Sequence, residues 1–198
     1  MRAKTLFFDI GNVLVFFSHQ KMMARLALIF ETSLESIQKF ILEEKIQDNY
    51  ELGHLSTQDL YNLFCSHFEK KPPLSQLKSA LNYAFLPNNE ILPILDCLRE
   101  NGHQLILLSN TCDAHFNYLI KNYPFLRTFD GKILSHKVFL KKPDPRIYEL
   151  ALSKAKYPSL FIDDLEENVL GANNSGLKAC VYTDVDQLQK ELKLNDYL

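Results

Sequence analysis

Short apolar runs alternate with longer segments of helical periodicity along most of the chain. The runs at 4–10, 104–109, 130–135, 159–163 and 178–182 are predicted strands. Helical spacing predicts helices at 90–101, 114–122, 145–155, 166–174 and 184–193. Short, wholly apolar strands that alternate with helices are typical of a parallel sheet with helices on both faces, so we expect an α/β fold.

A long helical zone, residues 18–86, interrupts this alternation after the first strand. Its periodicity predicts four helices, at 19–30, 33–44, 56–70 and 75–86, and Ser56 followed by Asp59 resembles an N-terminal capping box. Proline-containing breaks follow the last two of these helices. We therefore expect a core formed by residues 1–17 and 87–198, with residues 18–86 inserted as a helical cap that is hinged near 15–18 and 86–90.

Composition narrows the class of protein. The 198 residues carry a net charge of -2 and 46% hydrophobic residues, a balance that does not favour nucleic acid or an anionic membrane surface as a partner. The longest apolar runs, such as 105–108, are too short to span a membrane, and no signal-peptide pattern opens the sequence. Four scattered cysteines without a paired motif favour reduced thiols, so we expect a cytoplasmic protein.

Polar side chains stand at the ends of the predicted strands, where open parallel sheets bind their ligands. They are Asp9, Ser109, Asn110, Thr111, Asp163 and Asp164, with Lys141 and Lys142 in the loop before the helix at 145–155. Because the carboxyl ends of parallel strands meet at one edge of a sheet, we expect these groups to converge there.

Each of these motifs also has a structural interpretation. Asp9 could cap a loop, residues 109–111 could form a simple turn, and the two lysines could be solvated. Asp163 and Asp164 could cap the next helix. Four such coincidences at aligned strand ends are improbable, so the joint pattern favours a catalytic site.

Such a cluster suits phosphoryl chemistry. Three carboxylates repel one another unless a cation lies among them, and oxygen ligands of this kind suit Mg²⁺. A lysine and Mg²⁺ can share the charge of a phosphate group, while Ser109 and the amides of residues 109–111 can bind its remaining oxygens. Asp9 could then attack the phosphorus and form an aspartyl-phosphate.

The motifs FFDIGNV, LLSNT, KKPDPRIYE and FIDDLEENVLGANNSG occur in this order and resemble the haloacid dehalogenase-like (HAD) superfamily of hydrolases over nearly the whole chain. The resemblance implies a Rossmann-like core with a helical cap inserted after the first strand. It implies that Asp9 is the nucleophile and that Ser109 and Asn110 bind phosphate. It also implies that Lys142, rather than its neighbour Lys141, contacts the nucleophile and the phosphate.

The resemblance further implies a Mg²⁺ site. Its ligands would be Asp9, the main-chain carbonyl of Gly11 and Asp164 directly, with Asp163 bound through water. Gly11 departs from the family pattern, because phosphatases of the family usually carry a second aspartate there as general acid. The arrangement D-x-G-N-V resembles a subgroup that includes glucose-1-phosphatase-like phosphatases.

Three further positions are candidates for binding phosphate or substrate: Gly11, Asn12, which stands where the family usually has glycine, and His115. His115 could instead lie at a helix surface. From the cap, the sequence predicts substrate contacts by Lys45, Asp48, Asn49 and Tyr50.

The missing acid bears on the substrate, because general acid catalysis typically contributes about 10²–10⁴-fold. We therefore expect a Mg²⁺-dependent phosphatase for a small phosphorylated metabolite with a stable leaving group, such as a sugar 1-phosphate or an acyl or aryl phosphate. A non-catalytic protein that binds a phosphate ligand is the alternative. A 2-haloacid dehalogenase is disfavoured, since Asp163 and Asp164 are costly to hold together without a cation.

Overall fold

The computed structural model describes residues 3–198 and has a five-stranded sheet at its centre. Its strands are β1 (Thr5–Phe8), β4 (Gln104–Ser109), β5 (Gly131–Leu134), β6 (Ser159–Asp163) and β7 (Ala179–Val181). They are all parallel and lie in the order β5-β4-β1-β6-β7. The chain therefore builds outward from β1 in both directions, which is a doubly wound, Rossmann-like order and confirms the predicted α/β fold.

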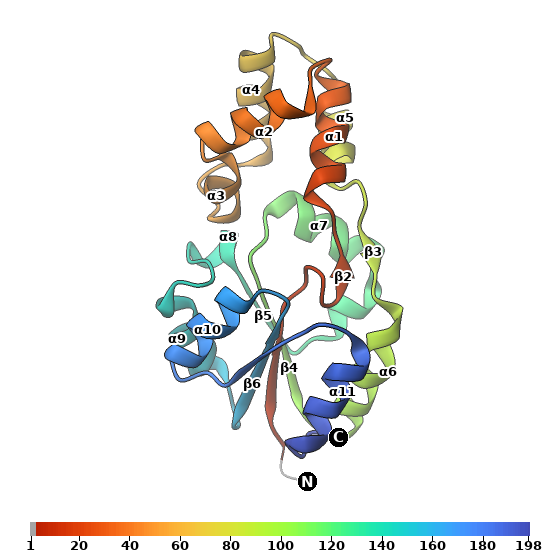
Figure 1. Cartoon of the computed structure of the whole chain (residues 1–198), viewed down its shortest axis with the longest axis vertical. Helices are drawn as coiled ribbons and strands as arrows, with labels where there is room; N and C mark the ends of the chain where they lie inside the picture. Colours follow the sequence, from red (N-terminus) through yellow and green to blue (C-terminus); the bar gives the residue numbers. More distant parts are fainter. Residues whose placement is uncertain (1–2) are drawn as a thin grey trace.

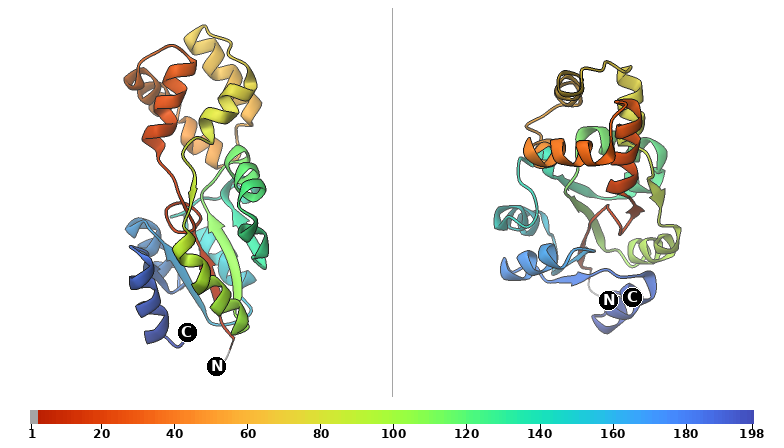
Figure 2. Two further views of the ribbon diagram at one scale, coloured as in Figure 1. Left: turned by 90° about the vertical axis from the view of Figure 1, so that its right-hand side faces the viewer. Right: turned by 45° about the horizontal axis from the view of Figure 1, so that its top comes forward.

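Helices cover both faces of this sheet because successive side chains of each strand point to opposite sides. Leu6 and Phe8 pack into a core with α6 (Leu92–Glu100), α7 (Asp113–Asn122) and α11 (Val185–Leu194). Phe7 points the other way and packs with α9 (Pro145–Lys154) and α10 (Glu166–Asn174). Figure 2 shows these layers from the side. Every residue of β1 is buried, as the continuous apolar run predicts.

Five helices form a separate group beyond the carboxyl ends of the strands (Figure 1). They are α1 (His19–Ile29), α2 (Leu34–Glu43), α3 (Ile46–Glu51), α4 (Thr57–Phe68) and α5 (Leu74–Leu81). We call residues 19–81 the helical unit. It has its own buried core, in which Leu26, Phe40 and Phe64 meet. The predicted capping box is present, because Ser56 and Asp59 each accept a hydrogen bond from the other's backbone N–H.

Two short strands connect the helical unit to the sheet. β2 (Val15–Phe16) and β3 (Leu86–Pro87) pair antiparallel, with Val15 opposite Pro87. The turn η1 (Asn89–Ile91) then leads into α6. The Asn88 side chain ties this ribbon to the sheet, since its Nδ2 donates to the carbonyl of Val13 and to the Tyr182 hydroxyl, both at 2.8 Å.

The structure differs from the sequence prediction mainly at element ends and in short helices. The helix predicted at 75–86 ends at Leu81, and the strand predicted at 4–10 ends at Phe8. Ala84 has a positive φ of 79°, which no continuing helix allows, although Phe85 keeps the apolar spacing. Helix α3, the four-residue helix α8 (Ser135–Val138) and the turn η2 (Pro124–Thr128) were not predicted. Within residues 3–198, no helix is long and apolar enough to cross a membrane.

Candidate active site

Asp9 lies immediately after β1, at the centre of the sheet edge that faces the helical unit. Its backbone N–H still donates to the Ile162 carbonyl at 2.9 Å, so the position of the residue is fixed by the sheet. The side chain is buried, and its Oδ1 is ion-paired with the ammonium of Lys142. Burial raises the pKa of Asp9 to about 6, although the nearby Lys142 opposes the shift. Ionisation of this buried carboxyl is therefore costly, and further positive charge beside it would favour the carboxylate form.

Lys142 supplies part of that charge from the loop between β5 and α9. Its Nζ lies 2.9 Å from Asp9 Oδ1 and 2.5 Å from Asp163 Oδ2, and its side chain is 1% exposed. Burial alone would lower the pKa of Lys142, but the two carboxylates together raise it, so the ammonium is charged. The Asn110 side chain holds the backbone of Lys142 from both sides, accepting from its N–H at 2.8 Å and donating to its carbonyl at 2.9 Å.

Asp163, the last residue of β6, is fully buried, and both of its oxygens are occupied. Besides the ion pair with Lys142, it accepts hydrogen bonds from the Leu165 N–H at 2.8 Å and from Asn168 Nδ2 at 3.0 and 3.1 Å. The hydroxyl of Tyr148 donates to the Asn168 carbonyl at 2.8 Å and steadies this helix start. Asp163 therefore anchors the lysine and the start of α10.

Asp164 is half-buried beside this anchor and completes a group of three acids. Oxygen atoms of Asp9, Asp163 and Asp164 lie within 4.8 Å of one another, a spacing that could hold a metal ion. Burial raises the pKa of Asp164, an effect that the Asn12 side chain reduces by donating to Oδ2 at 3.2 Å. Asn12 itself adopts a left-handed φ of 52°, which asparagine tolerates better than most residues. Gly11 lies between the nucleophile candidate and this turn.

Ser109 ends β4 next to Asp9 and is 2% exposed. The loop that follows is held from below by Ser135 at the start of α8. The Ser135 hydroxyl accepts from the Thr111 N–H at 2.9 Å and donates to the Glu51 carbonyl of the helical unit at 2.6 Å. His136 Nδ1 lies 3.0 Å from the Thr111 carbonyl. This segment therefore connects the sheet edge, the loop after β4 and the helical unit.

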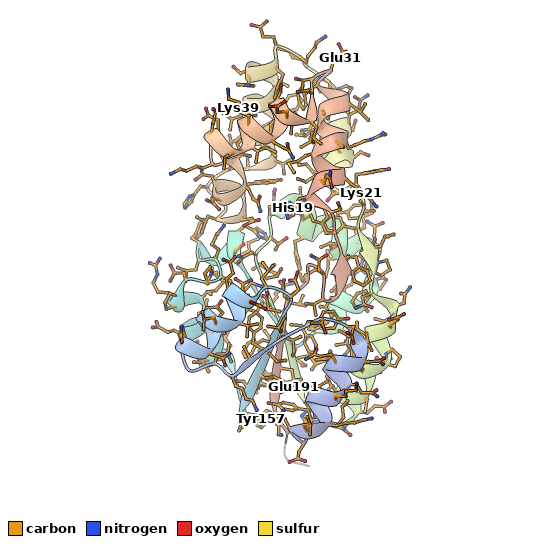
Figure 3. All side chains as sticks on the ribbon, in the orientation of Figure 1. His19, Lys21, Glu31, Lys39, Tyr157 and Glu191 are labelled. Atoms are coloured by element: carbon orange, nitrogen blue, oxygen red, sulfur yellow. The ribbon has the colours of Figure 1, made fainter. Side chains whose placement is uncertain are left out.

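A cavity of about 460 Å³ opens above these residues and extends into the helical unit. Asp9, Ser109, Lys142 and Asp164 lie at one end, and residues of α1, α2, α4 and α5 line the other. His115, on α7, also lines the cavity, so it lies beside the site and not on an outer helix surface. His19 lines it too, and Figure 3 shows this residue at the sheet-facing end of α1.

Four contacts with the substrate were expected from the helical unit, and the structure brings only one of these residues to the cavity. Tyr50 lines it, whereas Lys45, Asp48 and Asn49 are absent from the lining within residues 3–198. Asp48 instead forms an ion pair with Lys141, with Nζ 2.5 Å from Oδ1. The neighbouring lysines therefore have separate roles, because Lys142 contacts the acids of the sheet and Lys141 contacts α3.

Sequence reasoning missed Glu51, which lines the cavity and forms a second ion pair with Lys141 at 3.1 Å. It also missed Asn168 as a support for Asp163. The sequence pattern E-x-G-x-L-S, which begins at Glu51, could have drawn attention to this residue. Asn168 stands five residues after Asp163, a spacing that places it in the first turns of the following helix.

The sheet is Rossmann-like, and at its switch point a buried lysine lies between two carboxylates beneath a cavity. This arrangement is that of an α/β enzyme. Residues 3–176 match the family model of haloacid dehalogenase-like hydrolases, and the chain belongs to this family. The predicted family is thereby confirmed.

Solved structures of the same family share the fold of this chain. A HAD family enzyme from Bacteroides thetaiotaomicron, in complex with magnesium and inorganic phosphate, is 24% identical, with a TM-score of 0.83 over 94% of this chain and 99% of that one. A HAD-like family hydrolase from Porphyromonas gingivalis is 22% identical, with a TM-score of 0.78 over 96% and 98%. A HAD phosphatase from Thermococcus onnurineus is 20% identical, with a TM-score of 0.62 over 91% and 86%.

Among curated proteins, drimenol cyclase of Aspergillus calidoustus is 24% identical over 160 residues, or 77% of this chain. An uncharacterized protein of Lacticaseibacillus casei is 22% identical over 121 residues, or 61% of this chain. The matched regions span 30% and 55% of the lengths of these two relatives.

Proposed function

We propose that the protein is a Mg²⁺-dependent phosphatase that hydrolyses small phosphomonoesters through an aspartyl-phosphate on Asp9. The observation that carries this proposal is the state of Asp9 itself. It is buried at the sheet edge, and its Oδ1 lies 2.9 Å from the ammonium of Lys142. A family relative that binds magnesium and inorganic phosphate supports the same chemistry.

The residues present fit a Mg²⁺ ion. Asp9 and Asp164 would hold it together with the Gly11 carbonyl, since hard oxygen ligands of this type suit the ion. Asp163 is close enough to belong to the group, but its oxygens are already taken by Lys142, Leu165 and Asn168. We therefore assign it contact through water at most. When bound, the ion would supply positive charge that draws the phosphate group to the nucleophile.

The reaction would take two steps at the phosphorus. A carboxylate oxygen of Asp9 forms a bond to phosphorus while the bond from phosphorus to the ester oxygen breaks, and the leaving oxygen takes the electron pair. Lys142 and Ser109 stabilise the charge on the phosphoryl oxygens. Water then attacks the phosphorus of the aspartyl-phosphate, which releases inorganic phosphate and restores the Asp9 carboxylate.

Gly11 leaves the leaving group without a side-chain acid at the family's usual position. Esters whose leaving group is stable without prompt protonation should therefore react best, and these include sugar 1-phosphates, acyl phosphates and aryl phosphates. Residues 19–81 would act as a cap that covers the site and excludes bulk water from the intermediate. A protein that binds such ligands without turnover is the second candidate, because Gly11 removes a catalytic group.

Phosphate release from 4-nitrophenyl phosphate with Mg²⁺ tests the proposal. We expect turnover that EDTA abolishes, that added Mg²⁺ restores, and that the Asp9→Asn variant lacks. Phenyl phosphate should be hydrolysed at least about 10²-fold faster than ethyl phosphate, the low end of a general acid contribution. Binding of inorganic phosphate without any turnover would favour the non-catalytic alternative, and equal rates on the two esters would contradict the role given to Gly11.

A further inference from the structure

The cavity changes character with distance from Asp9. Near the sheet its walls are charged or polar, whereas the part within the helical unit is walled by apolar side chains. These include Met22 and Leu26 from α1, Ile41 from α2, Phe64 from α4, Leu81 from α5 and Phe85 from the linker. A phosphate bound at Ser109 and Lys142 would therefore present the rest of its molecule to an apolar wall.

Several of these side chains are only partly covered by protein. Met22, Met23 and Ile41 pack against the buried core of the helical unit but retain some exposure, and all three line the cavity. Because the three side chains line the cavity, part of their surface is available to a substrate. Covering it with an apolar group would be favourable by about 25 cal/mol per Å².

The polar groups nearest this wall already have partners in the protein. The Tyr50 hydroxyl lies 2.8 Å from Thr57 Oγ1, which in turn donates to Asp113 at 2.9 Å. Glu51 pairs with Lys141 at 3.1 Å. A sugar would bury several hydroxyls here, and each buried hydroxyl without a partner would weaken binding by about fivefold or more.

Gln47 and two histidines are the remaining polar groups in this part of the lining, and Gln47 Nε2 donates to Glu51 Oε1 at 2.9 Å. His115 contacts the rings of Phe17 and Phe85, with centroids 5.3 and 5.2 Å apart, and its buried Nε2 makes no hydrogen bond within residues 3–198. Burial lowers the pKa of His115 to about 4 and lowers the pKa of His19, so both rings are neutral at pH 7. Among the described residues that line this part, His115 Nε2 is therefore the one buried side-chain atom without a hydrogen-bond partner.

From this lining we propose that the organic group of the substrate is mainly apolar, an aromatic or aliphatic body that carries at most one polar group for His115. The inference rests on the proposed phosphatase function and selects among the activated esters: aryl or acyl phosphates fit the cavity, and sugar 1-phosphates do not. Met22, Met23 and Ile41 are then specificity-determining residues, because they form the wall that this group would cover.

A matched pair of aryl phosphates tests the inference. The esters 4-propylphenyl phosphate and 4-(2,3-dihydroxypropyl)phenyl phosphate share one carbon skeleton and a similar phenol leaving group, so they differ mainly in two hydroxyls. We expect kcat/KM to be about tenfold or more higher for the propyl ester, because the other ester would have to bury two hydroxyls without hydrogen-bond partners. The corresponding phosphonates, which are not hydrolysed, should show the same preference in calorimetric Kd measured with Mg²⁺.

Adjacent residues of α2 provide a matched pair of variants. Ile41→Gln places an amide in the wall, whereas Leu42→Gln changes a side chain that is 78% exposed and does not line the cavity. Ile41→Gln should remove most of the preference for the propyl over the dihydroxypropyl ester, and it should lower kcat/KM less for phenyl phosphate, which lacks the chain, than for the propyl ester. Leu42→Gln should retain the preference, and circular dichroism of each variant verifies that it is folded.

The outcomes separate the two claims. Equal or better turnover of the dihydroxypropyl ester would overturn the apolar substrate class and leave the phosphatase function standing. Phosphonates that bind with the propyl preference, combined with no phosphate release from either ester, would overturn hydrolysis and support the apolar site. Equal binding of both phosphonates by the wild-type protein refutes the inference whether or not the Ile41 variant folds.

Discussion

Replacing Asp9 by asparagine should stabilise the protein in the absence of metal while abolishing turnover. The pKa of the buried Asp9 carboxyl is raised from 3.8 to about 6, which at about 1.4 kcal/mol per pH unit makes its ionisation cost about 3 kcal/mol of folding free energy. Asparagine has nearly the same shape and no charge to bury. Lys142 keeps its ion pair with Asp163 in the variant, so no buried cation is left alone.

The sign of the pH dependence follows from the direction of the shift. Since the folded state holds the Asp9 proton more tightly than the unfolded state, wild-type stability falls as the pH rises from about 4 to about 6. The variant should therefore exceed the wild type by about 3 kcal/mol at pH 7.5 and by about half of that at pH 5. Below the unfolded pKa the difference should vanish.

Urea unfolding in EDTA, followed by circular dichroism at the two pH values, measures this difference. The exposed Asp186, in the first turn of α11, offers a matched control, and Asp186→Asn should change the unfolding free energy by no more than about 0.5 kcal/mol. Adding Mg²⁺ should stabilise the wild type and narrow the gap. An Asp9→Asn variant that is equal to or less stable than the wild type at pH 7.5 without metal would refute the reasoning.

Three further changes test other parts of the structure. Lys142→Met should lower kcat on 4-nitrophenyl phosphate by at least about 10²-fold, and a smaller loss in steady-state kinetics would remove the lysine from the catalytic group. Gly53→Ala should lower the melting temperature more than Gly102→Ala. Both glycines have a positive φ, at 73° and 76°, but only at Gly53 would the new Cβ lie 2.4 Å from the His136 carbonyl oxygen. Equal melting temperatures of the two variants would contradict this close contact. Lys141→Ala should raise KM by a factor of about 2–5 at low salt, as expected for partly exposed ion pairs, and an unchanged KM would show that these pairs do not help to hold α3 over the cavity.

The features of this protein that could be predicted are those that depend on residues close together in the sequence. Wholly apolar runs predicted the parallel sheet, and a polar residue directly after such a run predicted where Asp9 and Ser109 would lie. The family then followed from short motifs in order. Asp163 shows where such prediction ends. Its place in the site was predicted, but its hydrogen bonds from Lys142, Leu165 and Asn168 were not.

The remaining features depend on contacts between distant segments. Helix α3 has six residues, too few for periodicity to identify and too few to be stable alone, so its helical form depends on packing. The pairing of Lys141 with Asp48 joins residues 93 positions apart, and nothing in either neighbourhood indicates it. The apolar wall of the cavity likewise combines side chains from several helices.

The two-stranded ribbon that joins the helical unit to the sheet has a consequence for how this unit can be exchanged. Val15 is buried while Phe16 is 45% exposed, so the pairing places alternate side chains on opposite faces. One residue inserted within either strand of the pairing would shift the register and reverse those faces. Segments of different length and sequence could thus be grafted between Phe17 and Phe85 as a cassette, provided that both junctions are kept residue for residue.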